Sequence, residues 1–133
     1  KMLKEPAMLL QLLPYELSVC RFDRGQPVPD WAWEARFVSV TRTDEELSIF
    51  CDSAVVPEGE AAPGVWRAFR VAGQLDLELP GIISQLAVPL AAKQISIFSL
   101  STHDTDYMVV GEHQFQDACE VLRRAGHTLE EPS

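Results

Sequence analysis

Hydrophobic and polar residues alternate in several short stretches along the first half of the chain. Tyr15, Leu17 and Val19 are separated by polar neighbours, which is the period of a half-buried strand. Residues 37–40 and 47–51 are rich in strand-forming residues, and the connection between them is too polar to be anything but a solvated turn. This half therefore predicts a strand followed by a β-hairpin.

The second half of the chain combines the alternation typical of strands with the spacing typical of helices. Residues 66–71 alternate like a strand, and the same period continues through three more leucines up to position 79. Ile82, Leu86 and Leu90 are then spaced by four, which places them on one stripe of a helix. Pro89 lies inside this helix and predicts a kink, because it removes a backbone donor.

The rest of the chain predicts two strands, a helix and a last short strand. Residues 95–100 are apolar on both faces, which favours an interior strand, and a polar turn leads to a strand at 107–110. Apolar positions at helical spacing over 115–125 precede Gly126, which is typical of a helix end. The resulting order, β-α-β-β-α-β, is that of the α+β ferredoxin-like fold.

Composition and charge narrow the possible partners. The chain has 133 residues and a formal net charge of -9, which repels nucleic acid and anionic membrane surfaces. The apolar stretch 82–100 is interrupted by too many polar residues to span a membrane, and the N-terminus lacks the pattern of a signal peptide. We therefore expect a cytoplasmic protein whose three cysteines, without CxxC spacing, are reduced and buried.

Four segments of the second half resemble the signature of ACT-type amino-acid-sensing domains. They read PGII at 80–83, PLA at 89–91, ISIF at 95–98 and SLSTHDTDY at 99–107. The resemblance is strong over 66–126 and extends to the ACT domains of small tandem-ACT proteins, cytosolic arginine sensors and aspartokinases. It is weaker in the first half, where the hairpin is similar to that of an ACT unit without its first helix.

The resemblance implies tandem ferredoxin-like units. The first, residues 1–62, is an abbreviated ACT-like unit, and the second, residues 63–133, is a complete ACT-like domain. Such a protein is a non-enzymatic regulatory module that binds an amino acid at an ACT-like interface, needs no cofactor and forms a homo-oligomer, expected to be a dimer. The alternative is a ligand-free interaction or oligomerisation module, because exposed edges of ferredoxin-like sheets pair readily.

An amino acid needs partners for both of its charges. Backbone N–H groups at a glycine turn and helix start suit its carboxylate, and strand-end hydroxyls with an acid suit its ammonium group. By resemblance, these ligand-binding residues are Gly81, Ile82, Ile83, Thr102, Thr105 and Asp106. A structural interpretation stays open as well, since Asp and Thr side chains in a turn commonly bond to their own backbone.

Other chemistry finds little support in the sequence. His103, Asp104 and Asp106 share a single turn and have no distant His or Cys partner, so we expect no metal site. Ser101 lacks the surrounding glycines of a nucleophile elbow, and the chain has no phosphate-binding glycine loop. We therefore expect no enzyme activity.

Overall fold

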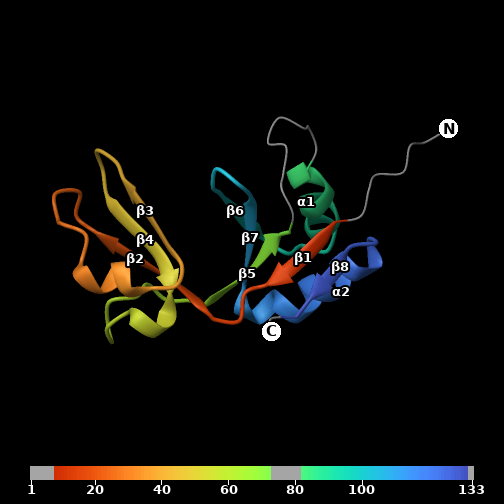
Figure 1. Cartoon of the computed structure of the whole chain (residues 1–133), viewed down its shortest axis with the longest axis horizontal. Helices are drawn as coiled ribbons and strands as arrows, with labels where there is room; N and C mark the ends of the chain where they lie inside the picture. Colours follow the sequence, from red (N-terminus) through yellow and green to blue (C-terminus); the bar gives the residue numbers. More distant parts are fainter. Residues whose placement is uncertain (1–7, 73–81, 132–133) are drawn as a thin grey trace. The chain divides into compact units, whose positions relative to one another are not determined.

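The computed structural model describes residues 8–72 and 82–131. Contacts divide the chain into two compact units. One unit is residues 15–66, and the other combines residues 8–14 with the described residues from Arg67 onward. Figure 1 labels the elements of both units.

The unit of residues 15–66 is a small antiparallel sheet with two short 3-10 helices. Its strands are ordered β3-β4-β2, and the predicted hairpin is confirmed as the pairing of β3 with β4. The elements are β2 (Leu17–Phe22), η1 (Asp30–Glu34), β3 (Val38–Arg42), β4 (Leu47–Asp52) and η2 (Ser53–Val55). Its buried core consists of Cys20, Ala32, Leu47, Ile49 and Cys51.

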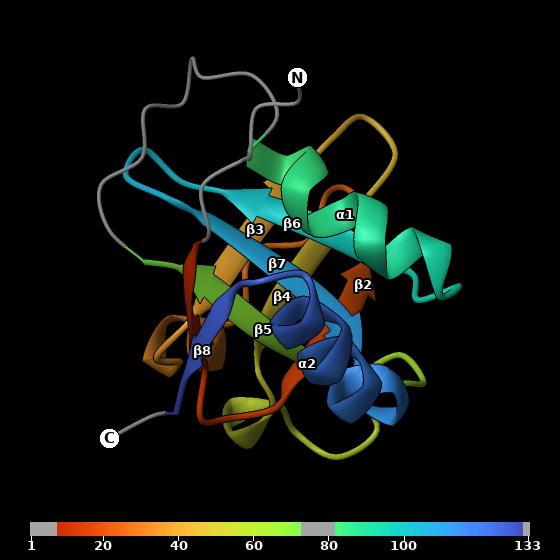
Figure 2. The same ribbon diagram turned by 90° about the vertical axis from the view of Figure 1, so that its right-hand side faces the viewer.

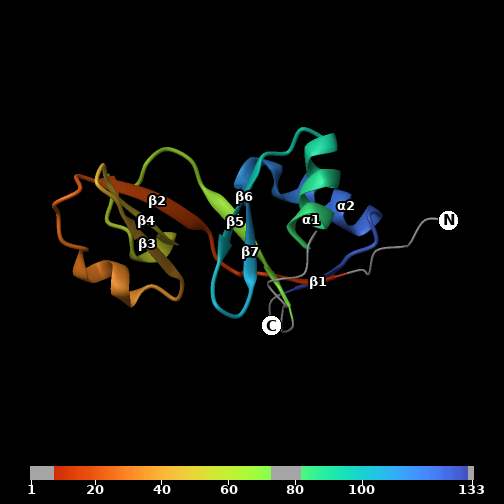
Figure 3. The ribbon, with the colours of Figure 1, turned by 90° about the horizontal axis from the view of Figure 1, so that it is seen from above.

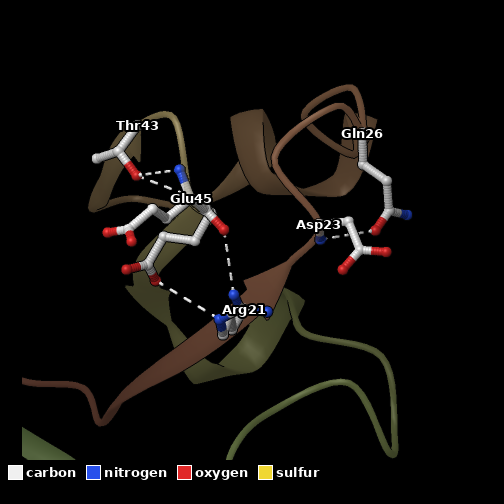
Figure 4. Close-up of polar contacts among 6 residues, drawn as sticks. Arg21, Asp23, Gln26, Thr43 and Glu45 are labelled. Carbon is white, nitrogen blue, oxygen red and sulfur yellow. Dashed lines mark hydrogen bonds and ion pairs between the residues drawn. The ribbon is translucent and has the colours of Figure 1, made fainter.

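Polar contacts hold the turn of this hairpin (Figure 4). The Thr43 hydroxyl oxygen accepts the backbone N–H groups of Glu45 and Glu46, at 3.0 and 3.1 Å. Arg21 on β2 donates to the Glu45 carbonyl at 3.2 Å, and its Nε lies 3.8 Å from the Glu46 carboxylate. Because these side chains satisfy backbone groups of the turn, the cluster is structural.

The second unit has the predicted β-α-β-β-α-β order. Its described strands are arranged β6-β7-β5-β1-β8, with β1 antiparallel to β5 and parallel to β8. The elements are β1 (Leu9–Leu12), β5 (Trp66–Val71), α1 (Ile82–Ala92), β6 (Ile97–Ser101), β7 (Asp106–Gly111), η3 (Glu112–Gln114), α2 (Phe115–Arg124) and β8 (Thr128–Glu130). The α+β ferredoxin-like class is confirmed.

Both helices cover the same face of this sheet (Figures 2 and 3). Leu86 and Leu90 of α1 and Leu122 of α2 are fully or almost fully buried, as the helical spacing predicts. They pack with strand residues into one core of Leu10, Leu12, Phe69, Val71, Leu86, Leu90, Ile95, Met108, Val110, Ala118, Cys119 and Leu122. The helix α1 continues past Pro89 to Ala92, and neither described helix is long and apolar enough to cross a membrane.

The prediction that 95–100 is an interior strand is wrong in one respect. The strand forms, from Ile97, but among the described strands β6 pairs with β7 alone and is therefore an edge strand. Ser99 is exposed, and the apolar side chains of β6 are half-buried. The sequence could not distinguish the two positions, because an apolar run has the same periodicity in an edge strand as in an interior strand. A separate prediction, that the strand starting at residue 66 continues up to position 79, lies outside the described residues.

The compact units also divide the chain differently from the expected boundary between residues 62 and 63. The first strand, β1, pairs with β5 and β8, so it belongs with the C-terminal half of the chain. Leu10 is fully buried in the core of that half. Burial of β1 therefore joins residues from both ends of the sequence in one unit.

Candidate functional site

Three of the six expected ligand-binding residues lie in the turn between β6 and β7 or at the first residue of β7. The Thr102 N–H donates to the Thr105 carbonyl at 2.8 Å. The Thr102 hydroxyl donates to the same carbonyl at 3.2 Å and accepts the Thr105 N–H, also at 3.2 Å. These three bonds close the turn on itself, so the backbone of Thr105 is held in place.

Thr105 and Asp106 attach this turn to the sheet. Both are buried, and the Thr105 hydroxyl donates to the Val71 carbonyl at the end of β5. Ser101 and Asp106 face each other across β6 and β7, and the Ser101 hydroxyl donates to Asp106 Oδ1 at 2.5 Å. The turn is thereby placed beside the end of β5, the strand that precedes α1 in the chain.

The other three expected residues lie around the start of α1. Gly81 is outside the described residues, Ile82 is the first residue of the helix, and Ile83 is partly buried against the core of its unit. Thr102, Thr105 and Asp106 are therefore brought together, and Thr105 bonds to the end of β5. Among the described residues, no hydrogen bond is seen between these three residues and the start of α1.

The hydrogen bonds decide what these side chains offer a ligand. Both threonine hydroxyls bond within the turn or to Val71, which fits the structural interpretation of Thr102 and Thr105. Asp106 differs, because its Oδ2 accepts no hydrogen bond from the described residues. A carboxylate with a free oxygen is a suitable acceptor for an ammonium group.

The three cysteines are free and buried, as predicted. Burial raises the pKa of each thiol, and for Cys51 the increase, to which Cys20 and Asp52 add, brings the pKa to about 11. Thiolate is the reactive form of cysteine, so these thiols are poor nucleophiles at neutral pH. Among the described residues no group of three or more His, Cys, Asp or Glu is arranged to hold a metal.

The structure also shows a groove that the sequence analysis did not identify. Arg67 on β5 stacks its guanidinium group over the Phe115 ring, 4.1 Å from the ring centre. Arg67 comes together with residues of α2 that are about fifty positions later in the chain. Because Arg67 belongs to no recognisable motif, the sequence held no signal for this arrangement. The groove has a volume of about 530 Å³ and is lined by Leu12, Pro14, Arg67, Phe115, Gln116, Cys119, Glu120, Arg123 and Glu131.

Comparison with protein families and curated proteins agrees with the fold. The sequence pattern of the ACT domain matches residues 61–124, and that of another N-terminal domain matches residues 16–59. Over 61 residues the chain is 41% identical to the cytosolic arginine sensor for mTORC1 subunit 1 from human and from cattle. That match covers 45% of this chain and 18% of the sensor's length.

Residues 61–124 therefore match an ACT domain. A solved structure from Agrobacterium tumefaciens shares the architecture along almost the whole chain, with 32% identity, a TM-score of 0.87 and coverage of 97% of this chain and 96% of that one. The regulatory subunit of aspartate kinase from Thermus thermophilus has the same fold at 11% identity, with a TM-score of 0.57 and coverage of 88% and 96%.

Proposed function

We propose that this chain is a cytoplasmic, non-enzymatic regulatory module that binds a free amino acid where the β6–β7 turn meets the end of β5. The observation that carries the proposal is the ACT-domain match over residues 61–124, which includes this turn and the start of α1. The similarity to a cytosolic arginine sensor supports both the ligand class and the location.

The two charged groups of the amino acid are assigned to different elements. Its carboxylate accepts hydrogen bonds from the backbone around Gly81, Ile82 and Ile83, where the helix start carries about half a positive charge. Its ammonium group donates to Asp106, whose Oδ1 is held by Ser101 at 2.5 Å. Thr102 and Thr105 fix the position of Asp106 through the bonds of the turn.

A thermal-shift screen against the twenty amino acids tests this function. A ligand at 100 times its Kd stabilises the folded state by about 2.7 kcal/mol, which raises Tm measurably. We expect one amino acid, or one chemical group of them, to raise Tm. If none of them does, the amino-acid proposal is rejected in favour of the interaction module considered below.

Calorimetry on Asp106→Asn then tests the residue. Loss of one charge-assisted partner costs about 1.5 to 3 kcal/mol, so the amino acid found in the screen should bind roughly ten- to a hundredfold more weakly. Asp104→Asn is the matched control, because Asp104 is exposed in the same turn and its carboxylate pairs with His103 instead. Equal affinity in Asp106→Asn and wild type would exclude Asp106 from the site.

A specific observation also favours a second candidate, the oligomerisation module. The edge strand β3 ends at Arg42, whose guanidinium donates to the backbone carbonyls of Arg24 and Gln26, and the edge strand β8 has three residues including the charged Glu130. Both features protect an edge from pairing with another chain. The edge strand β6 has no charged residue, and neither does the neighbouring helix α1, on which Val88 is 65% exposed.

This contrast supports a homodimer in which β6 pairs with β6 of a second copy. A lysine at exposed Ser99 places a charge in the centre of that edge and should convert the dimer to a monomer in sedimentation analysis. Thr128→Lys on β8 is the matched control and should leave the mass unchanged. A wild-type chain that is monomeric at all concentrations contradicts the homodimer, whatever the amino-acid screen shows.

A further inference from the structure

The groove between α2 and the strands β1 and β5 contains none of the residues assigned to the amino-acid site. Its most buried charged group is Arg67, whose side chain is 19% exposed. The Arg67 guanidinium lies on the Phe115 ring, which stacks in turn on Phe69 with 5.3 Å between ring centres. Its Nη2 donates to the Leu13 carbonyl at 3.2 Å. These contacts orient the guanidinium before any ligand arrives.

The donors of Arg67 are only partly used. A guanidinium has five N–H donors, and charge-assisted bonds to carboxylates are usually about 2.7–2.9 Å long. The Glu112 carboxylate is 3.5 Å from Nη1, and the buried Nε has no hydrogen-bond partner among the described residues. A buried donor without a partner is costly, so the structure holds unmet capacity for an oxygen acceptor here.

A second guanidinium lines the same groove. Arg123 on α2 is half-exposed, and its Nη2 is 4.0 Å from the nearest Glu131 oxygen, which is a loose ion pair. Arg67 and Arg123 both line this groove, together with Cys119. Burial raises the pKa of the Cys119 thiol; the positive charge of Arg123 opposes the increase, the negative charge of Glu131 adds to it, and the positive charge of Arg67 opposes it.

We propose that this groove is a separate binding site for a small carboxylate ligand, with the carboxylate held by Arg67 and Arg123. The apolar part of the ligand contacts Leu12, Pro14 and Phe115, which line the same groove. A volume of about 530 Å³ is in the usual range for small-molecule sites. The Glu120 and Glu131 side chains, which also line it, disfavour ligands with several negative charges.

Nuclear magnetic resonance of the arginine Nε–H groups tests the proposal directly. Butyrate is the probe, because it carries one carboxylate and a short apolar chain and lacks the amino group that the other site requires. Its addition should shift the Arg67 Nε–H signal in a saturable manner, and butylamine, which carries the opposite charge, should not. Absence of a saturable shift with butyrate overturns the proposal.

Variants locate the probe in the groove. Arg67→Met should weaken butyrate binding roughly tenfold or more, measured on the remaining signals of the groove. Arg70→Met is the matched control, because Arg70 is on the same strand, bonds to Gln11 and does not line this groove. Equal weakening in both variants contradicts a specific site.

Two exposed positions keep the test valid if Arg67→Met fails to fold. Arg123→Gln should weaken butyrate binding, and Glu112→Gln should strengthen it, because the Glu112 carboxylate competes with the ligand for Arg67. Unchanged affinity in both variants overturns the proposal. Since butyrate is no α-amino acid, this result is independent of the amino-acid screen and of Asp106.

Discussion

The two helices α1 and α2 cover the same face of one sheet and differ in what they expose. Both bury leucines against the shared core, with Leu86 and Leu90 on one helix and Leu122 on the other. The outer face of α2 is charged and carries the Glu120–Arg124 ion pair at 3.3 Å, whereas α1 has no charged residue. The two helices therefore pack on the sheet through similar apolar inner faces and differ in the charge of their outer faces.

Their C-terminal ends offer a second comparison. In α1 the Ile95 N–H donates to the Leu90 carbonyl at 3.0 Å, and in α2 the His127 N–H donates to the Leu122 carbonyl at 3.1 Å. Both ends need a residue with positive φ just before the donor. That residue is Gly126 after α2, with φ of 101°, and Gln94 after α1, with φ of 61°. One helix therefore ends with the favoured residue and the other with a strained one.

The largest expected effect is the loss of stability when a buried leucine is truncated in either helix, which tests whether the inner faces of α1 and α2 contribute equally to the core. Leu90→Ala and Leu122→Ala each remove a fully or almost fully buried side chain and should each lower the free energy of unfolding by about 2–5 kcal/mol. Chemical denaturation of both variants measures the losses. A cost below 1 kcal/mol for either one would show that its helix is not part of the common core.

The helix ends should respond in opposite directions. Gly126→Ala places a side chain at a φ of 101° and should destabilise the protein by about 1–2 kcal/mol, although no atom lies within 4 Å of the added Cβ. Gln94→Gly relieves the same kind of strain and should stabilise it by up to about 1 kcal/mol. Denaturation midpoints measure both changes, and a destabilising Gln94→Gly would contradict the strain argument.

The outer face of α1 is tested by association. Val88→Glu adds a charge at an exposed apolar residue of α1 and should change unfolding stability by no more than about 0.5 kcal/mol. It should nevertheless weaken self-association of the chain, measured by sedimentation equilibrium. Unaltered association of a dimeric protein would remove α1 from the interface.

The smallest effect is expected on the outer face of α2. Glu120→Gln breaks an exposed i,i+4 ion pair and should cost about 0.3–0.5 kcal/mol of unfolding stability. Raising the salt concentration should reduce the difference between the two proteins, because the pair is solvated. A loss above 1 kcal/mol would show that the pair does more than link two solvated side chains.

Local patterns were enough to predict the helices, the hairpin and the β-α-β-β-α-β order. Leu86, Leu90 and Leu122 are buried because their spacing matches the helical repeat. The edge position of β6 and the insertion of β1 could not be predicted, since both depend on pairing between distant segments and leave no periodic signal. For the candidate site, the sequence indicates that Thr102, Thr105 and Asp106 lie close together, but only the structure shows that both threonine hydroxyls are already bonded.

The insertion of β1 between β5 and β8 has a consequence for how the chain folds. Leu9–Leu12 pairs with Thr128–Glu130, and the Met8 N–H donates to His127 across 119 positions of sequence. Contacts of such separation form slowly, because a long loop must close before they become favourable. During synthesis residues 15–66 can fold as a continuous segment, whereas the second unit waits until the final strand has left the ribosome. Until then the edge of β1 that pairs with β8 is open, and an open strand edge is a site at which unwanted pairing can begin.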